Sequence, residues 1–252
     1  MKKIFLLIAV LFAVAHIADA QLIWEDRFEY APGTALEGQG GWELGTGKWT
    51  SGYSPKVIDR KLKYSGYASS EAGSVFIEGT GVNRLTYKVI DEKGITNGAV
   101  YVAMLVNLES VDGVRDFITL DAGTGNSPRV KIFIKNMGSG FAVGTSMADV
   151  KTATFSRGLA YKTPHLIVLK YAFVKKDEKS PVDNNDRIAL FVNPLPELAE
   201  NKQDAVKLTR SKDDKAEDIK KIKAVNIRQS GVAGHICGMR VAKSWNAAVK
   251  EN

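Results

Sequence analysis

Three large aromatic residues near the start of the chain lie among glycines and serines: Trp42, Trp49 and Tyr53. Exposed aromatic faces stack on sugar rings, while nearby polar groups form hydrogen bonds to the sugar hydroxyls. We therefore predict that these three residues contribute to a ligand-binding face for glycans. The alternative is that the same rings pack in or beside the core, because Trp and Tyr bury a large area wherever they occur.

A cluster of oxygen-bearing side chains precedes an apolar run late in the chain. Asp183, Asn185 and Asp186 lie within four residues of one another. Hard cations such as calcium prefer carboxylate and amide oxygens, so the cluster is a candidate calcium site. Asn and Asp are also common turn formers, and the spacing is not that of an EF-hand loop, so a structural turn is the alternative. No other cofactor is expected.

The carboxylates do not have the spacing of a glycosidase. A retaining enzyme needs two carboxyl groups about 5–5.5 Å apart. Asp116 and Asp121 are the nearest pair within one expected strand, and residues five apart point to opposite faces of a regular strand. No catalytic residue is assigned, and we expect a non-catalytic protein.

A histidine and a cysteine lie two residues apart near the end of the chain. His235 and Cys237 would share a face of an extended segment, as a reactive pair or as two metal ligands. The alternative is a small buried thiol beside a surface histidine, because free cysteine behaves as a small hydrophobe. Cys237 is the sole cysteine, which excludes an internal disulfide.

Composition places the chain among soluble globular proteins. Of its 252 residues, 44% are hydrophobic and 25% charged, which excludes disordered, collagenous and multi-span membrane classes. The net charge of +7 is compatible with acidic polysaccharide as a partner or with a solvated basic surface. The cations are spread along the chain, which favours the solvated surface, and no nucleic-acid partner is expected.

The first twenty residues have the pattern of a secretory signal peptide. Lys2 and Lys3 precede an apolar run over residues 4–17, and Ala18-Asp19-Ala20 fits a cleavage site. The run is too short for a membrane anchor, so no membrane span is expected in the mature chain. We predict a signal peptide over residues 1–20, a mature chain beginning at Gln21, and export to the periplasm, the outer surface or the medium.

Alternation of apolar and polar residues dominates the remaining sequence. Residues 99–108 are apolar on both faces, which predicts a central strand, and residues 129–135 alternate as a half-exposed strand. Further strands are expected over residues 165–174, 187–192, 224–229 and 238–242. Glycine-rich turns separate the strands and no long amphipathic helix is present. We predict an all-β antiparallel β-sandwich over residues 21–252, as a single domain.

One segment departs from this pattern. Residues 197–223 hold eight Lys or Arg and seven Asp or Glu. Such a mixed-charge run is typical of a solvated excursion between core strands, here with a helical turn near residues 216–221. The alternative is a recognition loop for an acidic partner.

Several strands resemble those of a known group. The segments that carry the resemblance are residues 28–36 with Gly41-Trp42, and residues 100–107, 165–171, 185–194, 225–229 and 238–245. In this order they resemble exported bacterial proteins with a concanavalin A-like, laminin-G-like jelly roll, mostly of unknown function. The resemblance implies a jelly roll after a signal peptide. The C-terminal sorting tail frequent in that group is not found after Trp245, which favours the periplasm or free secretion over surface attachment.

These observations lead to one expected function and two alternatives. We expect a non-catalytic exported module that binds glycans or proteins, with extracellular or envelope polysaccharide or surface proteins as partners. A structural, envelope-associated protein without a small ligand is the first alternative, and a carbohydrate-active hydrolase is the second. Sandwiches of this class include lectins, binding modules and glycosidases, so the fold does not choose among them.

Overall fold

The structure is a computed structural model that describes residues 21–46, 50–79, 82–125, 128–176, 178–179 and 182–251. The predicted signal peptide over residues 1–20 and the predicted ligand-binding residue Trp49 lie outside the described residues. No helix in the described part of the chain is long and apolar enough to cross a membrane.

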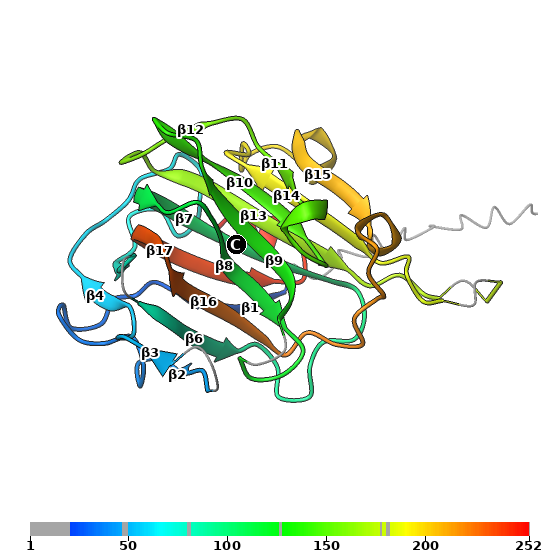
Figure 1. Cartoon of the computed structure of the whole chain (residues 1–252), viewed down its shortest axis with the longest axis horizontal. Coiled ribbons are helices and arrows are strands. Elements are labelled where there is room, and N and C mark those ends of the chain that lie inside the picture. The colour runs from blue at the N-terminus through cyan, green and yellow to red at the C-terminus, as the bar shows by residue number, and fades with distance from the viewer. Residues whose placement is uncertain are drawn as a thin grey trace, which may run out of the picture.

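Two antiparallel sheets form a sandwich, as predicted (Figure 1). In sheet A the order is β15-β14-β13-β7-β17-β5-β4, and β1 pairs with β17. Its strands are β1 (Leu22–Asp26), β4 (Lys56–Ile58), β5 (Ser74–Ile77), β7 (Ala99–Val111), β13 (His165–Ala172), β14 (Arg187–Val192), β15 (Ala205–Arg210) and β17 (Val232–Ala242).

Sheet B has the order β11-β10-β9-β8-β16-β6-β2, with β12 paired to β10 and β3 paired to β6. Its strands are β2 (Trp42–Leu44), β3 (Thr50–Ser51), β6 (Asn83–Val89), β8 (Val114–Asp121), β9 (Pro128–Asn136), β10 (Gly140–Ser146), β11 (Thr154–Phe155), β12 (Leu159–Ala160) and β16 (Ala224–Ser230). The short helices are η1 (Val150–Thr152), η2 (Glu200–Lys202), η3 (Ser211–Asp214) and α1 (Trp245–Val249).

The central position predicted for residues 99–108 is confirmed, because β7 pairs with β13 on one side and β17 on the other. One face of β7 lies in the core between the sheets, and the other lies in a second apolar cluster on the outer face of sheet A. The alternation predicted for residues 129–135 is also confirmed in β9. There Val130, Ile132 and Ile134 are core residues, and Arg129 and Lys135 are exposed.

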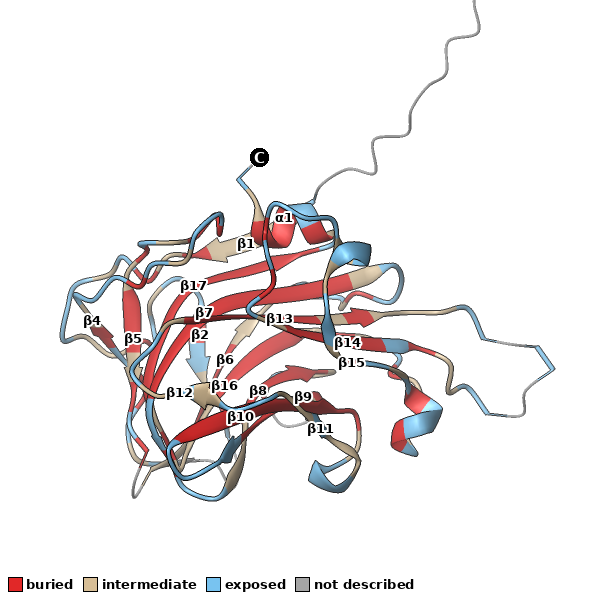
Figure 2. Ribbon diagram, turned by 90° about the horizontal axis from the view of Figure 1, so that it is seen from above, coloured by how far each residue is buried: buried red, intermediate tan, exposed pale blue. Residues whose placement is uncertain are grey.

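The second cluster explains which part of sheet A is covered from outside. Residues 62–72 and helix α1 pack on the outer face of β7 and its neighbours. Figure 2 shows α1 lying over the edge of this sheet beside β1 and β17. Ser244 caps α1 by accepting a hydrogen bond from the Ala247 amide at 3.3 Å. The Trp245 ring meets Phe191 of β14 edge-on, with ring centroids 5.0 Å apart. These covering segments do not extend over β15, so the outer face of sheet A is open there.

The charged segment over residues 197–223 is not simply a solvated excursion. It contains β15, which pairs with β14, and its two short helices are η2 and η3, with none at the turn predicted near residues 216–221. Lys207 is only 7% exposed and points between the sheets. Its ammonium donates to the carbonyls of Thr145 and Thr152 at 3.2 and 2.8 Å and pairs with Asp214. A buried, fully bonded lysine looks identical to a solvated one in sequence, which is why the prediction was wrong.

Candidate functional site

Tyr53 lies at the surface and borders a hollow of about 380 Å³. Its side chain is 71% exposed, and the hollow is also lined by Glu37, Lys56 and Arg84. We call this the Tyr53 site. Tyr53 lies in the loop between β3 and β4, so the ring is presented by a connection and not by a strand.

The backbone that carries Tyr53 is held from several sides. Arg84 of β6 donates to the Gly52 carbonyl through Nη2 at 2.9 Å and through Nε at 3.2 Å. The side-chain amide of Gln229 donates to the Tyr53 carbonyl. Gly52 has a φ of +91°, and a Cβ there would lie 2.7 Å from a methyl carbon of Val82, so only glycine fits. The ring is therefore exposed on a fixed base, which reduces the ordering cost of binding.

The polar groups around Tyr53 complement its ring. Glu37 Oε2 is buried and has no hydrogen-bond partner among the described residues. Its backbone amide donates to Ser54 Oγ at 3.0 Å, which fixes the residue in place. Lys56 Nζ lies 5.9 Å from the Tyr53 ring centroid. An aromatic face, an unpaired carboxylate oxygen and two cationic donors can together hold a ligand with an apolar face and hydroxyl groups.

Trp42 packs in the core, so its prediction as a ligand-binding residue is corrected. It is 0% exposed, and its Nε1 donates to the Asp26 carboxylate at 2.7 Å. Its ring lies edge-on to Trp24, with centroids 6.2 Å apart. The cause is the pairing of β2 with β6, which sets Trp42 opposite Lys88 with its ring in the core between the sheets. No face of the ring is open to a sugar.

The predicted calcium ligands Asp183, Asn185 and Asp186 lie close to Asp218, whose carboxylate caps the backbone of this turn. The amides of Asn185 and Asp186 each donate to the Asp218 carboxylate at 2.9 Å. Burial and the neighbouring Asp218 raise the pKa of Asp183. Among the described residues, no group of three or more His, Cys, Asp or Glu side chains is placed to hold a metal ion. The turn interpretation accounts for this cluster.

Asp186 itself faces the protein interior. It is 2% exposed, and its carboxylate accepts hydrogen bonds from the Tyr171 hydroxyl and from the Val174 amide. Burial, opposed by these two bonds, raises the pKa of Asp186 to about 6. Both of its oxygens are occupied by donors from the protein, so they are not free to coordinate a cation.

Asp116 and Asp121 differ from the sequence prediction because β8 is not regular. Its register with β9 shifts between Asp116 and Ile118, and this bulge brings both carboxylates to the outer face of sheet B. There Asp116 pairs with Arg228, while Asp121 accepts from Asn226 Nδ2 at 3.0 Å. Asp121 is fully buried. The pair therefore shares a face, but it does not present two carboxylates to a substrate.

The buried thiol predicted at Cys237 is confirmed. Cys237 is fully buried, donates to the Ala72 carbonyl at 3.1 Å, and has a pKa raised by burial to about 11. His235 is buried too, contrary to the surface position expected for it. Its Nε2 lies 3.2 Å from Glu109 and 2.7 Å from Arg60, and burial together with Arg60 lowers its pKa. Each side chain has its own partners, so they do not form a reactive pair.

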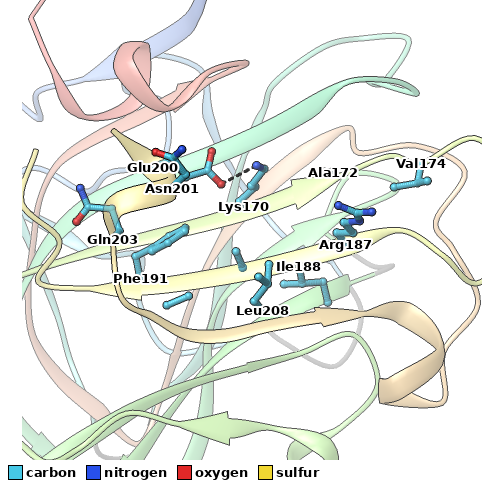
Figure 3. Close-up of a pocket in the computed structure, with 12 residues that line it drawn as sticks. Lys170, Ala172, Val174, Arg187, Ile188, Phe191, Glu200, Asn201, Gln203 and Leu208 are labelled. Atoms are coloured by element: carbon cyan, nitrogen blue, oxygen red, sulfur yellow. Dashed lines mark hydrogen bonds and ion pairs between the residues drawn. The ribbon is translucent and has the colours of Figure 1, made fainter. Parts of the chain in front are cut away.

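A larger hollow, of about 760 Å³, lies on the outer face of β13, β14 and β15, where the cover of sheet A ends (Figure 3). Its floor is formed by the small residues Ala172 and Ala189. Lys170 at one side bonds to Glu200 of η2 at 2.6 Å. We call this hollow the β13–β15 groove. The sequence did not predict it, because two alanines in a strand leave a groove only where neighbouring segments rise around them, and the sequence does not show which segments do so.

The comparisons with known proteins are distant. Neither a protein-family model nor a curated protein matches the chain. Similar solved structures include the cellulose-induced protein Cip1, with a TM-score of 0.49, 14% identity and coverage of 88% of this chain and 97% of that chain. A carbohydrate esterase, vb_24B_21, of the Shiga toxin-encoding bacteriophage phi24B has a TM-score of 0.49 and 10% identity, covering 92% and 100%. Domain 4 of AbnA, an extracellular GH43 arabinanase from Geobacillus stearothermophilus in complex with arabinotriose, has a TM-score of 0.49 and 8% identity, covering 92% and 99%. At these scores, function has to be argued from the residues of this chain.

Proposed function

We propose that this protein is a non-catalytic glycan-binding module that acts after export, and that sugar binds at the Tyr53 site. The observation that carries the proposal is the 71% exposed ring of Tyr53 beside the buried, unpartnered oxygen of Glu37. Among the described aromatic residues, Tyr53 is the one that is largely exposed. Trp49, four residues earlier in the sequence, is proposed as a second stacking residue.

The chemistry of a sugar fits each part of this site. The C–H face of a pyranose ring stacks on the Tyr53 ring. A sugar hydroxyl donates to the carboxylate of Glu37, which lines the hollow. Lys56 and Arg84, which line the same hollow, donate to sugar oxygens. These groups orient a ligand, and none of them is paired with a second carboxylate in the manner of a hydrolase.

The expected partner is extracellular or envelope polysaccharide. This follows from the signal peptide predicted over residues 1–20, which directs the chain to the periplasm, the outer surface or the medium. Surface glycoproteins offer the same sugars and belong to the same ligand class. A structural protein without a small ligand is the competing interpretation, and it requires that the exposure of Tyr53 have no consequence for binding.

A glycan array followed by titration tests the proposal. We expect Tyr53→Ala to weaken binding of the best glycan by about 5- to 30-fold, which corresponds to about 1–2 kcal/mol for a lost stacking contact. Glu37→Gln should weaken it as well, while melting temperatures stay unchanged. Met137→Ala, at another exposed apolar side chain, is the matched control. If no glycan binds, or if Tyr53→Ala binds as tightly as the control, the proposal fails and the structural interpretation gains.

A further inference from the structure

Two arginines lie directly opposite each other at the edge of sheet A. The register of β14 with β15 pairs Arg187 with Arg210, and both residues are exposed. Ile188 and Leu190 of β14 are core residues, so Arg187 points to the outer face, and its cross-strand neighbour Arg210 shares that face. Side chains of directly opposite residues start about 4.5–5.5 Å apart.

Neither arginine forms an ion pair with any carboxylate in the described part of the chain. The nearby Asp213 accepts hydrogen bonds from the Arg210 backbone amide at 3.2 Å and from the Thr209 hydroxyl at 3.3 Å. Asp186, next to Arg187 in sequence, points inward to Tyr171. Like charges placed opposite each other destabilise a sheet. No carboxylate of the described residues forms an ion pair that would offset this repulsion, and such local violations are typical of functional sites.

The arginine pair adjoins the β13–β15 groove. Arg187 lines one end of the groove, and Asn201 and Gln203 line the other (Figure 3). At the cationic end Ala172 pairs directly with Arg187, and Ala189 lies between the two ends, with Leu208, 75% exposed, opposite it on the neighbouring strand. The groove therefore combines an apolar floor, a cationic end and an amide end.

We propose that the β13–β15 groove binds an anionic polysaccharide, with one carboxylate or sulfate group held between Arg187 and Arg210. Two guanidinium groups can bind such an anion through charge-assisted, bidentate hydrogen bonds. The C–H face of the sugar ring rests on Ala172, Ala189 and Leu208. The next units of the chain run toward Asn201 and Gln203, whose amides bind hydroxyls. The anion removes the repulsion between the two arginines, so ligand binding stabilises this edge of the sheet.

This site is separate from the Tyr53 site, and its ligand class is different. Glu200 at the side of the groove is neutralised by Lys170 at 2.6 Å, so the charge that remains among the lining residues is the positive charge of Arg187. The net charge of +7 raises the association rate of any polyanion but gives no specificity. Specificity has to come from the arginine pair and the groove. The controls must therefore separate loss of these two arginines from loss of a positive charge elsewhere.

The test compares polygalacturonate, dextran sulfate and neutral dextran as probes, with binding measured by titration. We expect Arg187→Gln and Arg210→Gln each to weaken polyanion binding by about tenfold, and the double variant to weaken it further. Leu208→Ser should weaken it too, because the sugar loses an apolar contact. Arg129→Gln removes one positive charge from an exposed site on β9 of the other sheet and is the matched control. Melting curves establish that every variant is folded.

Each outcome decides the proposal. Binding of polygalacturonate alone identifies a carboxylate as the bound group, binding of dextran sulfate alone identifies a sulfate, and both results support the site. The proposal is overturned if neither polyanion binds, if the double arginine variant binds normally, or if Arg129→Gln is as damaging as Arg187→Gln. Tyr53→Ala should leave polyanion binding unchanged, so failure of the glycan proposal and failure of this one are distinguishable.

Discussion

Replacing Asp186 with asparagine should remove a pH dependence from the stability of the fold. The Asp186 carboxyl is 2% exposed and accepts hydrogen bonds from the Tyr171 hydroxyl and the Val174 amide. Burial raises its pKa to about 6 in the folded protein, against about 3.9 in the unfolded chain. The folded state therefore holds a proton that the unfolded state has already released in this pH range.

The sign and size of the effect follow from linkage. A raised folded-state pKa contributes stability that is complete below about pH 4 and is lost as the pH rises through about 6. A difference of about two pKa units corresponds to about 3 kcal/mol in the free energy of unfolding. Asparagine resembles the protonated acid and does not titrate. Asp186→Asn should therefore match the wild type near pH 4 and exceed it by about 2–3 kcal/mol at pH 7.

Urea unfolding of both proteins at pH 4, 5, 6 and 7 measures this difference directly. Comparing variant with wild type at each pH cancels the titration of groups that do not interact with Asp186. Asp204→Asn makes the same substitution at an exposed aspartate and is the matched control. If the difference between Asp186→Asn and wild type does not change between pH 4 and pH 7, the burial argument for Asp186 is wrong.

Three further predictions concern buried or processed parts of the chain. Lys207→Met should lower the free energy of unfolding by about 3–5 kcal/mol, because Asp214 would remain buried without its cation. In denaturation curves the double variant Lys207→Met with Asp214→Asn should recover much of that loss. Cys237 should react with a bulky thiol reagent at least about a hundredfold more slowly in the native than in the unfolded protein, and equal rates would contradict its burial and its pKa near 11. N-terminal sequencing of the exported protein should begin at Gln21, and a mature chain beginning at Met1 would refute the signal peptide.

The strands could be predicted from sequence because their signal is local. In β9 the alternation of apolar and polar side chains indicates which residues face the core, and in β7 the apolar residues on both faces indicate a strand that is covered on both sides. The bulge in β8 shows where this reasoning ends. One extra residue between Asp116 and Ile118 reverses which face the later residues occupy, and no residue type in the strand announces it.

The sites could be predicted only in part, because exposure depends on distant segments. Trp42 and Tyr53 have similar surroundings in sequence, but the pairing of β2 with β6 buries Trp42, whereas a loop presents Tyr53. Glu37 joins Tyr53 through the fold, from sixteen residues away in the sequence. The β13–β15 groove exists because α1 covers only part of sheet A, and that limit is set by tertiary packing.

The inward-pointing Lys207 also affects whether two molecules can pair through the edge of sheet A. β15 is the last strand of sheet A, and an open edge of this kind is a template on which another chain can add a strand and begin aggregation. Here the edge is short, its pairing with β14 shifts between Leu190 and Phe191, and Lys207 points inward with its charge bound inside. Short edges, bulges and inward-pointing charges are the features that block such addition. Molecules held close together on one polymer, as the proposed function requires, are thereby kept from joining through their β15 edges.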